Sequence, residues 1–340
     1  MSNQVYTRQQ LVFPAIEATY GVVPASHPVN GDACLVASFN ADVIAPEIVR
    51  PDKTGSFGEI LGIPGRRAAT WSASMAMAGG GTATTPPDSN EFLQLAFGTA
   101  PTIGGSSVTY APSDAVPPPS ASIFDFNDPS TATQFVVLGA ICSKFGIDLG
   151  GDVPMFTFSG EAMWVYDTIQ AADGTTDTVA KGGLVSFPTR PSAPVVHGIP
   201  PQGYSGTWTL DANAYTSLRK VSIASTIARA TQKDTNSSYP VGPGVGLRSY
   251  VISWDMYDDD SANLSALKTK SLKNTNPFPV ENLSFVIGTT AGNIFTMTGK
   301  NAKILAPTYD KQSERRIVKF SAKLHDTSIG SNDALTLVCT

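Results

Sequence analysis

The chain has 340 residues, 15 % of them charged, and a formal net charge of −5. This weakly acidic balance lacks the basic excess that is typical of nucleic-acid-binding proteins. Its 30 Gly and 25 Pro residues are typical of short strands joined by many turns, and its length favours two domains. We therefore expect a mostly β protein.

Three cysteines, Cys34, Cys142 and Cys339, are widely spaced and form no C-x-x-C motif. An odd number without such spacing indicates reduced thiols and folding in a cytoplasm. The first residues contain no apolar signal segment, and no run of about eighteen apolar residues occurs. We therefore expect a protein that is neither exported by a signal peptide nor anchored in a membrane.

The N-terminal region contains two apolar segments followed by a long loop. Residues 9–20 are largely apolar, but Pro14 interrupts any strand or helix there. Residues 33–44 alternate well enough to predict a first strand. Residues 45–64 are rich in proline and glycine and predict a loop of about twenty residues, a length that usually indicates function or a bound partner.

The stretch 65–77 resembles a later stretch, 246–258. Both begin with glycine and are rich in aromatic or β-branched residues, so each predicts a strand. Aligned without a gap, they share four residues: Gly65 with Gly246, Arg67 with Arg248, Ser72 with Ser253 and Met75 with Met256. We interpret the two stretches as copies of one internal repeat.

A short helix is predicted after each copy. Asp88 and Asp260 each stand at the position of an N-cap, where a side-chain oxygen accepts hydrogen bonds from the first free amides of a helix. An apolar pair spaced three residues apart then marks one face of a helix in each copy. These pairs are Phe92 with Leu95 and Leu264 with Leu267.

The same order of elements continues after each predicted helix, with a strand pair joined by a turn and then a closing strand. The strand pairs are predicted at 136–145 and 285–295, and the closing strands at 155–161 and 317–323. Residues 207–218 are interpreted as the second-half counterpart of the first strand. A second long loop is predicted at residues 228–245. The order as a whole favours a duplication.

The duplication divides the chain into a first domain (1–165), a linker (166–204) and a second domain (205–340). Residues 1–166 hold 6 Lys and Arg against 14 Asp and Glu, a net charge of −8, whereas residues 167–340 hold 17 against 14, a net charge of +3. Opposite charges on related domains suit head-to-tail contacts around a ring. Drift of surface charge after duplication explains the difference equally well.

Candidate catalytic and ligand-binding motifs are each incomplete. Gly292–Lys300 ends in Thr-Gly-Lys, but its glycine spacing differs from that of a phosphate-binding loop. The histidines His27, His197 and His325 have no second His or Cys at ligand spacing. The carboxylates at 258–260 offer too few oxygen ligands for calcium. We expect no enzymatic activity, no cofactor and no metal site.

Several stretches, in their order along the chain, resemble one known family. These stretches are Ala15–Gly21, Val49–Asp52, Gly65–Met77 and the C-terminal region Gly288–Thr340. Together they resemble the major tail tube proteins of long-tailed, siphovirus-like bacteriophages. The likeness covers both ends of the chain and is moderate in the middle, and none of the stretches is a chemical signature by itself.

The resemblance implies a fold and a structural role. Each half is expected to form a β-sandwich or barrel with a short flanking α-helix, and the sheets of neighbouring copies are expected to join into a ring. A duplicated subunit implies a homotrimeric ring with pseudo-sixfold symmetry. Stacked rings form the tail tube of the virion, which assembles in the cytoplasm of the host bacterium and conducts DNA without specific binding.

The resemblance also implies contacts and partners. The loops at 45–64 and 228–245 are expected to reach the adjacent ring. The residues assigned to this contact are Arg50, Asp52, Lys53, Phe57, Glu59, Arg229, Lys233, Asp234 and Tyr239. Tape-measure, tail-terminator and tail-tip proteins are the expected partners. Three alternatives stay open: another β-rich virion part such as a tail-tip or receptor-binding protein, the inner tube of a contractile injection device, and a hydrolase with a site assembled from distant residues.

Overall fold

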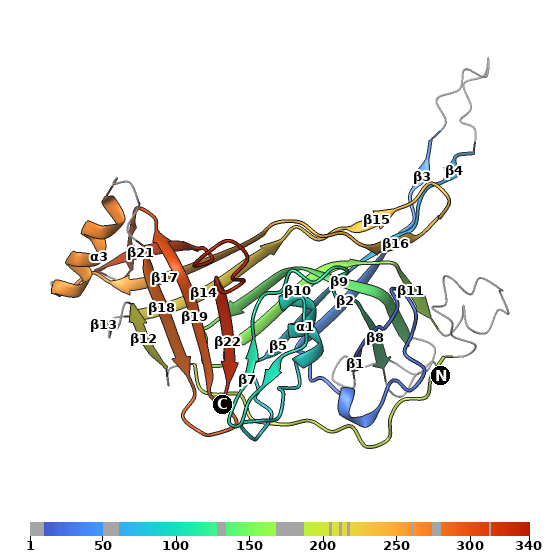
Figure 1. Ribbon diagram of the computed structural model, residues 1–340, viewed down its shortest axis with the longest axis horizontal. Helices are drawn as coiled ribbons and strands as arrows, with labels where there is room; N and C mark the ends of the chain where they lie inside the picture. Colours follow the sequence, from blue (N-terminus) through green and yellow to red (C-terminus); the bar gives the residue numbers. More distant parts are fainter. Residues whose placement is uncertain are drawn as a thin grey trace, which may run out of the picture.

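The protein is mostly β, as the composition predicts (Figure 1). The computed structural model describes residues 10–49, 61–127, 134–167, 187–203, 206–210, 213–215, 218–259, 261–273, 280–312 and 314–340. Within these residues, antiparallel strands form one large sheet system and two short hairpins, accompanied by two α-helices.

The first half contains the 3-10 turn η2 (Asn30–Asp32), the helix α1 (Asn90–Phe97) and eleven strands. The strands are β1 (Gln10–Ile16), β2 (Ser38–Ile44), β3 (Glu47–Ile48), β4 (Ile63–Pro64), β5 (Ala68–Ala76), β6 (Thr102–Ile103), β7 (Val108–Tyr110), β8 (Ala121–Asn127), β9 (Phe135–Asp148), β10 (Met155–Ala162) and β11 (Trp164–Asp167).

The second half contains the helix α3 (Ala262–Leu272) and a further set of strands. These are β12 (Thr207–Leu210), β13 (Asn213–Ala214), β14 (Leu218–Ile227), β15 (Thr231–Lys233), β16 (Pro240–Pro243), β17 (Arg248–Tyr257), β18 (Glu281–Ile287), β19 (Phe295–Ile304), β20 (Thr308–Gln312), β21 (Arg315–Leu324) and β22 (Leu335–Cys339). Between the halves, residues 187–203 contain no strand.

The strands of the two halves pair in the same order. In the first half β2 pairs with β5, β5 with β10 and β10 with β9; in the second, β14 pairs with β17, β17 with β21 and β21 with β19 and β20. A second layer also repeats, since β1–β8–β9–β11 corresponds to β12–β18–β19–β22. Each half also has a short hairpin at the same place, β3–β4 or β15–β16.

The pairing registers agree with the residues that the sequence alignment matched. Ser72 on β5 lies opposite Ser159 on β10, and its match Ser253 on β17 lies opposite Ser321 on β21. The closing strands predicted at 155–161 and 317–323 are therefore confirmed as β10 and β21, and they occupy equivalent positions beside the two repeat strands.

One sheet runs through both halves because β9 also pairs with β14. Residues 144–148 of β9 lie antiparallel to residues 222–226 of β14, while the other edge of β9 pairs with β10. The order across the two halves is therefore β2-β5-β10-β9-β14-β17-β21-β20. We call this arrangement the shared sheet.

The core lies on one face of the shared sheet and consists largely of aromatic rings. In the first half the Phe92 ring on α1 lies 5.7 Å from the Trp71 ring and 5.4 Å from the Phe158 ring. In the second half the Trp254 ring lies 5.5 Å from Phe320, which occupies the position equivalent to Phe158. Successive side chains of a strand point to opposite faces of the sheet. The residues that alternate with these rings therefore lie on the face away from the core.

The strand pair predicted at 285–295 is confirmed as β18 and β19, whereas the one predicted at 136–145 is wrong. Residues 136–145 form no hairpin, because β9 continues through them as one strand. Gly139 has a positive φ of 61°, inside the strand, whereas Gly288, with φ 93°, does lie between β18 and β19. The same sequence pattern, an apolar run that ends in glycine, therefore has two outcomes. At Gly139 it is an irregularity within β9, and at Gly288 it is the turn between β18 and β19.

The counterpart of the first strand was also misplaced. Residues 207–218 do not form one strand: 207–210 belong to β12, and the strand that corresponds to β2 is β14. In addition, β1 forms despite Pro14, which lies opposite Ile123 on β8. Proline is tolerated there because β8 is the only named strand with which β1 pairs among the described residues.

Candidate functional site

The face of the shared sheet opposite the core carries short, uncharged side chains. Residues directly opposite each other in the ladders share a face, so the registers identify its members. Those with a hydroxyl, amide or methyl group include Ser38, Asn40, Ala68, Thr70, Ser72, Ser74, Ala76, Thr157, Ser159, Ser222, Ala224, Thr226, Ser249, Ser253, Thr308 and Ser321. We call this surface the hydroxyl face; it extends across both halves.

The charged side chains on the hydroxyl face are of both signs. They comprise Asp42, Lys144, Asp148, Glu161, Lys220, Asp255, Lys303, Asp310, Arg315, Lys319 and Lys323. The Lys220 ammonium lies 3.3 Å from the Asp148 carboxylate, and that of Lys319 lies 2.6 Å from Asp310. The hydrogen bond from Lys319 lowers the pKa of Asp310 below its usual value. With five acidic and six basic groups intermixed, the surface is close to neutral and has no strong positive excess to hold a phosphate backbone.

The two short hairpins project from one end of the molecule, next to each other (Figure 1). Of the residues assigned to an inter-ring contact, Arg50, Asp52, Lys53, Phe57 and Glu59 lie outside the described residues. Lys233 and Asp234 are exposed at the β15–β16 hairpin. The Asp234 carboxylate accepts a hydrogen bond from the Asn236 amide at 3.1 Å, which lowers its pKa.

Tyr239, by contrast, is not free for a contact with another ring. Its hydroxyl accepts a hydrogen bond from Arg67 at 2.7 Å, and its ring lies edge-on to Trp164, with centroids 5.7 Å apart. The Arg67 guanidinium lies over both rings, and the Arg67 amide donates to the Ser238 carbonyl at 2.8 Å. The prediction for Tyr239 is therefore corrected: it fastens the β15–β16 hairpin to the first half.

Arg229 also acts within the chain, which corrects the second loop assignment. It is 5 % exposed, and its guanidinium donates to the Leu95 carbonyl in the last turn of α1. A cation is favourable there because the free carbonyls of a helix C-terminus carry partial negative charge. Burial lowers the pKa of Arg229. Arg248, the match of Arg67, donates to Asp114 at 2.6 Å and to Asn332 at 2.7 Å, so it too joins the halves.

The glycines that open the repeat strands serve the bases of the hairpins. A Cβ at Gly65 would lie 2.7 Å from the Pro46 carbonyl oxygen, and one at Gly246 would lie 2.3 Å from the Ala228 carbonyl oxygen. Both positions need the close backbone approach that only glycine permits. The matched residues Met75 and Met256 are buried in the core.

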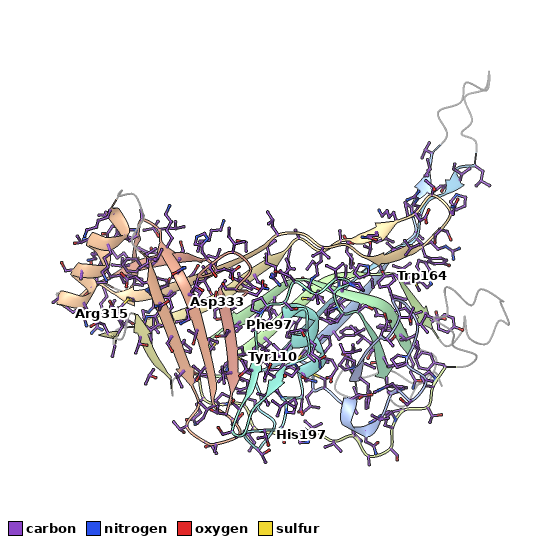
Figure 2. The ribbon with its side chains drawn as sticks, viewed as in Figure 1. Phe97, Tyr110, Trp164, His197, Arg315 and Asp333 are labelled. Carbon is purple, nitrogen blue, oxygen red and sulfur yellow. The ribbon has the colours of Figure 1, made fainter. Side chains whose placement is uncertain are left out.

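The two predicted helix caps have different outcomes. The N-cap of α1 is Ser89, and the preceding Asp88 instead accepts hydrogen bonds from the amide and the Nδ1 of His197, at 3.0 and 2.9 Å. Asp88 is thus corrected from a cap to an anchor for the segment 187–203, which it holds through His197 (labelled in Figure 2). Asp260 lies outside the described residues, and the N-cap of α3 is Ser261, whose side chain accepts from the Leu264 amide.

The conspicuous acidic residue of the stretch 15–21 is buried and fully bonded. The Glu17 carboxylate accepts hydrogen bonds from the Ser120 and Ser122 hydroxyls at 2.6 and 2.7 Å, and from the Gly21 and Gly139 amides at 2.8 and 2.9 Å. Burial raises its pKa. All four donors are serine hydroxyls or backbone amides of the fold itself. Glu17 therefore joins the end of β1 to β8 and β9.

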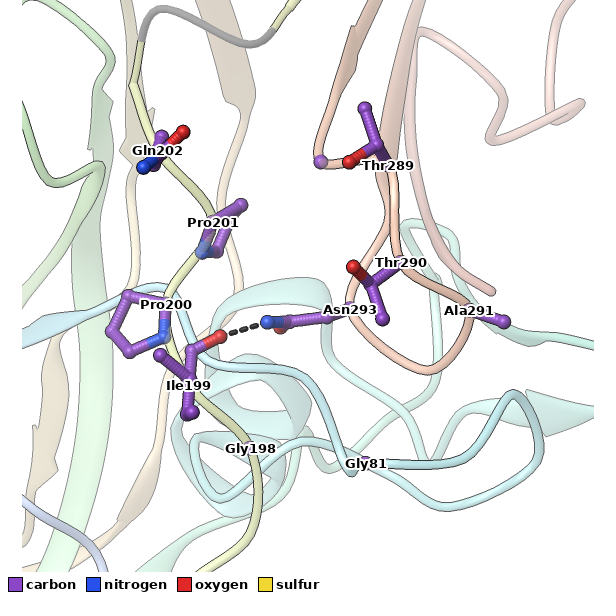
Figure 3. A pocket seen from close by; sticks show the side chains of 11 residues that line it. Gly81, Gly198, Ile199, Pro200, Pro201, Gln202, Thr289, Thr290, Ala291 and Asn293 are labelled. Atoms are coloured by element: carbon purple, nitrogen blue, oxygen red, sulfur yellow. Dashed lines mark hydrogen bonds between the residues drawn. The ribbon is translucent and has the colours of Figure 1, made fainter.

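A surface pocket of about 460 Å³ lies between the segment 198–202 and the turn 288–291 (Figure 3). Asn293 spans it, donating to the Ile199 carbonyl and accepting from the Gly79 amide at 2.7 Å. The pocket has no ionisable side chain among its lining residues. Among the described residues, no group of three His, Cys, Asp or Glu side chains could hold a metal, and neither helix is long and apolar enough to cross a membrane.

Comparison with known proteins adds no relative: no protein-family model matches the chain, and no curated protein matches it.

Proposed function

We propose that this protein is the building block of a phage tail tube, a structural protein without catalytic activity. Copies join head to tail into rings, the rings stack into a tube, and DNA passes through the lumen without specific binding. Assembly takes place in the cytoplasm of the host bacterium, and the tape-measure, tail-terminator and tail-tip proteins of the virion complete the tail.

The observation that carries this proposal is the hydroxyl face of the shared sheet. One face of the sheet is packed on the core, while the other spans both halves and carries Ser, Thr, Asn and Ala with intermixed charges. Such a surface gives a polyanion no strong basic patch to bind, and its apolar side chains, such as Ile44, Met155 and Val251, are scattered rather than contiguous. It suits the wall of a conduit.

The number of strands supports a trimeric ring. Each chain contributes eight strands to the shared sheet: β2, β5, β10, β9, β14, β17, β21 and β20. Three chains give roughly 24 strands, which at a spacing of about 4.8 Å and a tilt of about 40° enclose a barrel about 48 Å across. A lumen of that size admits a DNA double helix. The repeated pairing order gives such a trimer six similar wall segments.

Negative-stain microscopy of the purified protein at high concentration, with end-on views averaged, tests the proposal. We expect tubes built from threefold rings with six lobes around an open lumen. True sixfold rings, each built from six whole chains, would support the conduit but contradict the trimeric ring. Persistent monomers, or fibres and spikes without a lumen, would contradict the proposed function and favour another virion part.

The hairpins at one end of the molecule suit contacts between rings. Exposed Lys233 and Asp234 at β15–β16, together with the loop at 50–60, are the candidates for this contact. A chain in which residues 50–60 are replaced by a short glycine-serine linker is expected to form isolated rings that do not lengthen. If this variant forms tubes of normal length, residues 50–60 are not needed for ring stacking. The proposed role as a conduit would be unaffected by that result.

A further inference from the structure

Two strand pairings join the halves among the described residues: β7 with β22 in the second layer, and β9 with β14 in the shared sheet. The β9–β14 junction is the one that makes the shared sheet continuous. Asp148 lies opposite Ser222 and Gly146 opposite Ala224, in an antiparallel register. The Leu149 amide donates to the Val221 carbonyl at 2.9 Å, so the pairs 148/222 and 146/224 are those without mutual hydrogen bonds.

Both strands of this junction have counterparts at the ends of the shared sheet. β2 corresponds to β14, because each pairs with the repeat strand of its half; Asn40 lies opposite Ser72, as Ser222 lies opposite Ser253. β20 corresponds to the C-terminal part of β9, because each pairs with the closing strand of its half. Asp148 lies opposite Met155, and Asp310 lies opposite Ile317 at the equivalent position.

These two counterparts are edge strands. Among the described residues, β2 pairs only with β5 and β20 only with β21. Tyr309 on β20 is 49 % exposed, although its counterpart on β9, Ile147, is 2 % exposed beneath β14. On β2, Val43 is 48 % exposed, whereas its counterpart Ser225 is buried at the junction. Apolar side chains on an unpaired edge provide a surface for another strand.

We propose that β20 of one copy pairs with β2 of the next copy, in the antiparallel register that β9 and β14 use within the chain. Applied to the edges, this register places Asp310 opposite Asn40, Tyr309 opposite Ala41 and Thr308 opposite Asp42. The partner is a second copy of this chain. The inference deepens the proposed function and rests on it for closure of the ring, whereas the pairing itself follows from the internal junction.

The two edges are different surfaces, so the contact is heterologous and repeats from copy to copy until a ring or a filament forms. It extends the hydroxyl face, because Asp42 and Asp310 already belong to it. It also covers the Tyr309 ring, which lies 4.1 Å from the Arg316 guanidinium in the isolated chain. The wall would then be continuous around the ring. Junctions between β9 and β14 within a chain would alternate with junctions between β20 and β2 of neighbouring chains.

Disulfide trapping tests the register. Asp42→Cys and Thr308→Cys are introduced together; their predicted pair lacks mutual hydrogen bonds, so the two side chains approach closely, at a Cα separation of about 4.5 Å. The native Cys34, Cys142 and Cys339 are buried and serve as an unreactive background. Mild oxidation of the assembled protein is expected to give covalent dimers and closed trimers, at least tenfold more abundant than in either single variant.

The matched control is Ser38→Cys with Thr308→Cys. Ser38 lies on the same strand and the same face as Asp42, but four residues away, roughly 13 Å along the strand. Equal or greater cross-linking in this control, or none in Asp42→Cys with Thr308→Cys while rings are visible, would overturn the register and leave the tube intact. A covalent ladder without any lumen in micrographs would support the pairing and contradict the tube.

Hydrogen exchange of the unmodified protein provides a second readout, in case the cysteine variants do not fold. Peptides covering 38–44 and 308–312 are expected to exchange at least tenfold more slowly in assembled protein than in dilute monomer. Peptides from 222–226 should not change, because this edge is already paired with β9. Unchanged exchange at both edges in assembled protein would overturn the proposal.

Discussion

The two halves of the molecule share one order of strand pairing, yet their helices are covered to different extents. α1 buries five residues: Phe92, Leu93, Leu95, Ala96 and Phe97. α3, at the same place in the repeat, buries only Leu264 and Leu267. In Figure 1, α1 lies within the body of the molecule, whereas α3 projects at one end.

The difference arises from what surrounds each helix. The last turn of α1 receives Arg229 from the second half, and the nearby β7 pairs with β22, opposite Leu337 to Cys339. Among the described residues, the ion pairs of α3 come from its own half: Lys268 pairs with Asp258 and Lys270 with Glu281. The comparison indicates that the second half completes the cover of α1, while α3 stays more exposed.

The largest expected effect is a core truncation in the covered half. Phe92→Ala removes a fully buried ring that lies against Trp71 and Phe158, so the free energy of unfolding should fall by about 3–5 kcal/mol. Leu264→Ala in α3 should cost less, about 2–3 kcal/mol, because a helix with exposed sides can move into the vacated space. Urea unfolding measures both; a larger loss in α3 would contradict the comparison.

Next is the cation that joins the halves. Arg229→Met removes the buried donor to the Leu95 carbonyl, and we expect a loss of about 2–3 kcal/mol in the free energy of unfolding. Its matched control is Glu47→Gln, at the base of the other hairpin, which keeps an acceptor for the Gly62 amide and should cost less than about 0.5 kcal/mol. Equal effects in urea unfolding would mean that the bond across the halves adds no stability.

A buried carboxyl distinguishes the first half by its pH response. Burial raises the pKa of Asp125 on β8 to about 6, and its Oδ1 has no hydrogen-bond partner in the described part of the chain. The folded state therefore holds this proton more tightly than the unfolded state. The contribution of Asp125 to stability is largest below pH ~4 and is lost as pH rises through about 6.

Asp125→Asn should remove that loss. It keeps an acceptor for Gln10, whose Nε2 lies 3.0 Å from the carboxylate, and should raise the free energy of unfolding at pH 7 by about 1–3 kcal/mol. The same substitution should have little effect at pH 4. Urea unfolding at both pH values measures this, and a variant that is less stable at pH 7 would show that the charged form is favoured.

The smallest expected effect concerns Asp333, a partly exposed carboxylate of the second half whose pKa is lowered rather than raised. Hydrogen bonds from the Ser331 hydroxyl at 2.6 Å and from Thr327 lower the pKa of Asp333 to about 2. Its contribution is present above the unfolded pKa of about 4 and is lost as pH falls towards 2. Asp333→Asn should slightly lower the thermal midpoint at pH 7 and leave it unchanged at pH 2; equal shifts at both would refute the assignment.

The sequence predicted the features that depend on neighbouring residues. The repeat strands, their opening glycines and the closing strands were found because strand alternation and close backbone approach restrict residue choice locally. Even the register of Ser72 with Ser159 agrees with the alignment. Both helices were also identified by an apolar pair three residues apart.

Long-range contacts were not predictable in the same way. Arg229, Tyr239 and Asp88 have polar groups that suit a surface loop or a cap, and only the fold brings the Leu95 carbonyl, Arg67 and His197 to them. β14 was missed although its apolar Val221 and Ile223 alternate with short residues, as in a half-buried strand. The same alternation in β5 was the signal for the hydroxyl face, and comparing the two strands would have revealed it.

The junction of β9 with β14 has a consequence for the timing of synthesis. Residues 144–148 leave the ribosome roughly 80 residues before their partner strand, a delay of about 4–16 s at 5–20 residues per second. For that interval the edge of β9 is open to pairing with a strand from another nascent chain. Lys144 is exposed at this edge, and a charged side chain there discourages such pairing. The Lys144 charge is therefore already present at the edge of β9 during the interval in which the first half is most prone to aggregate.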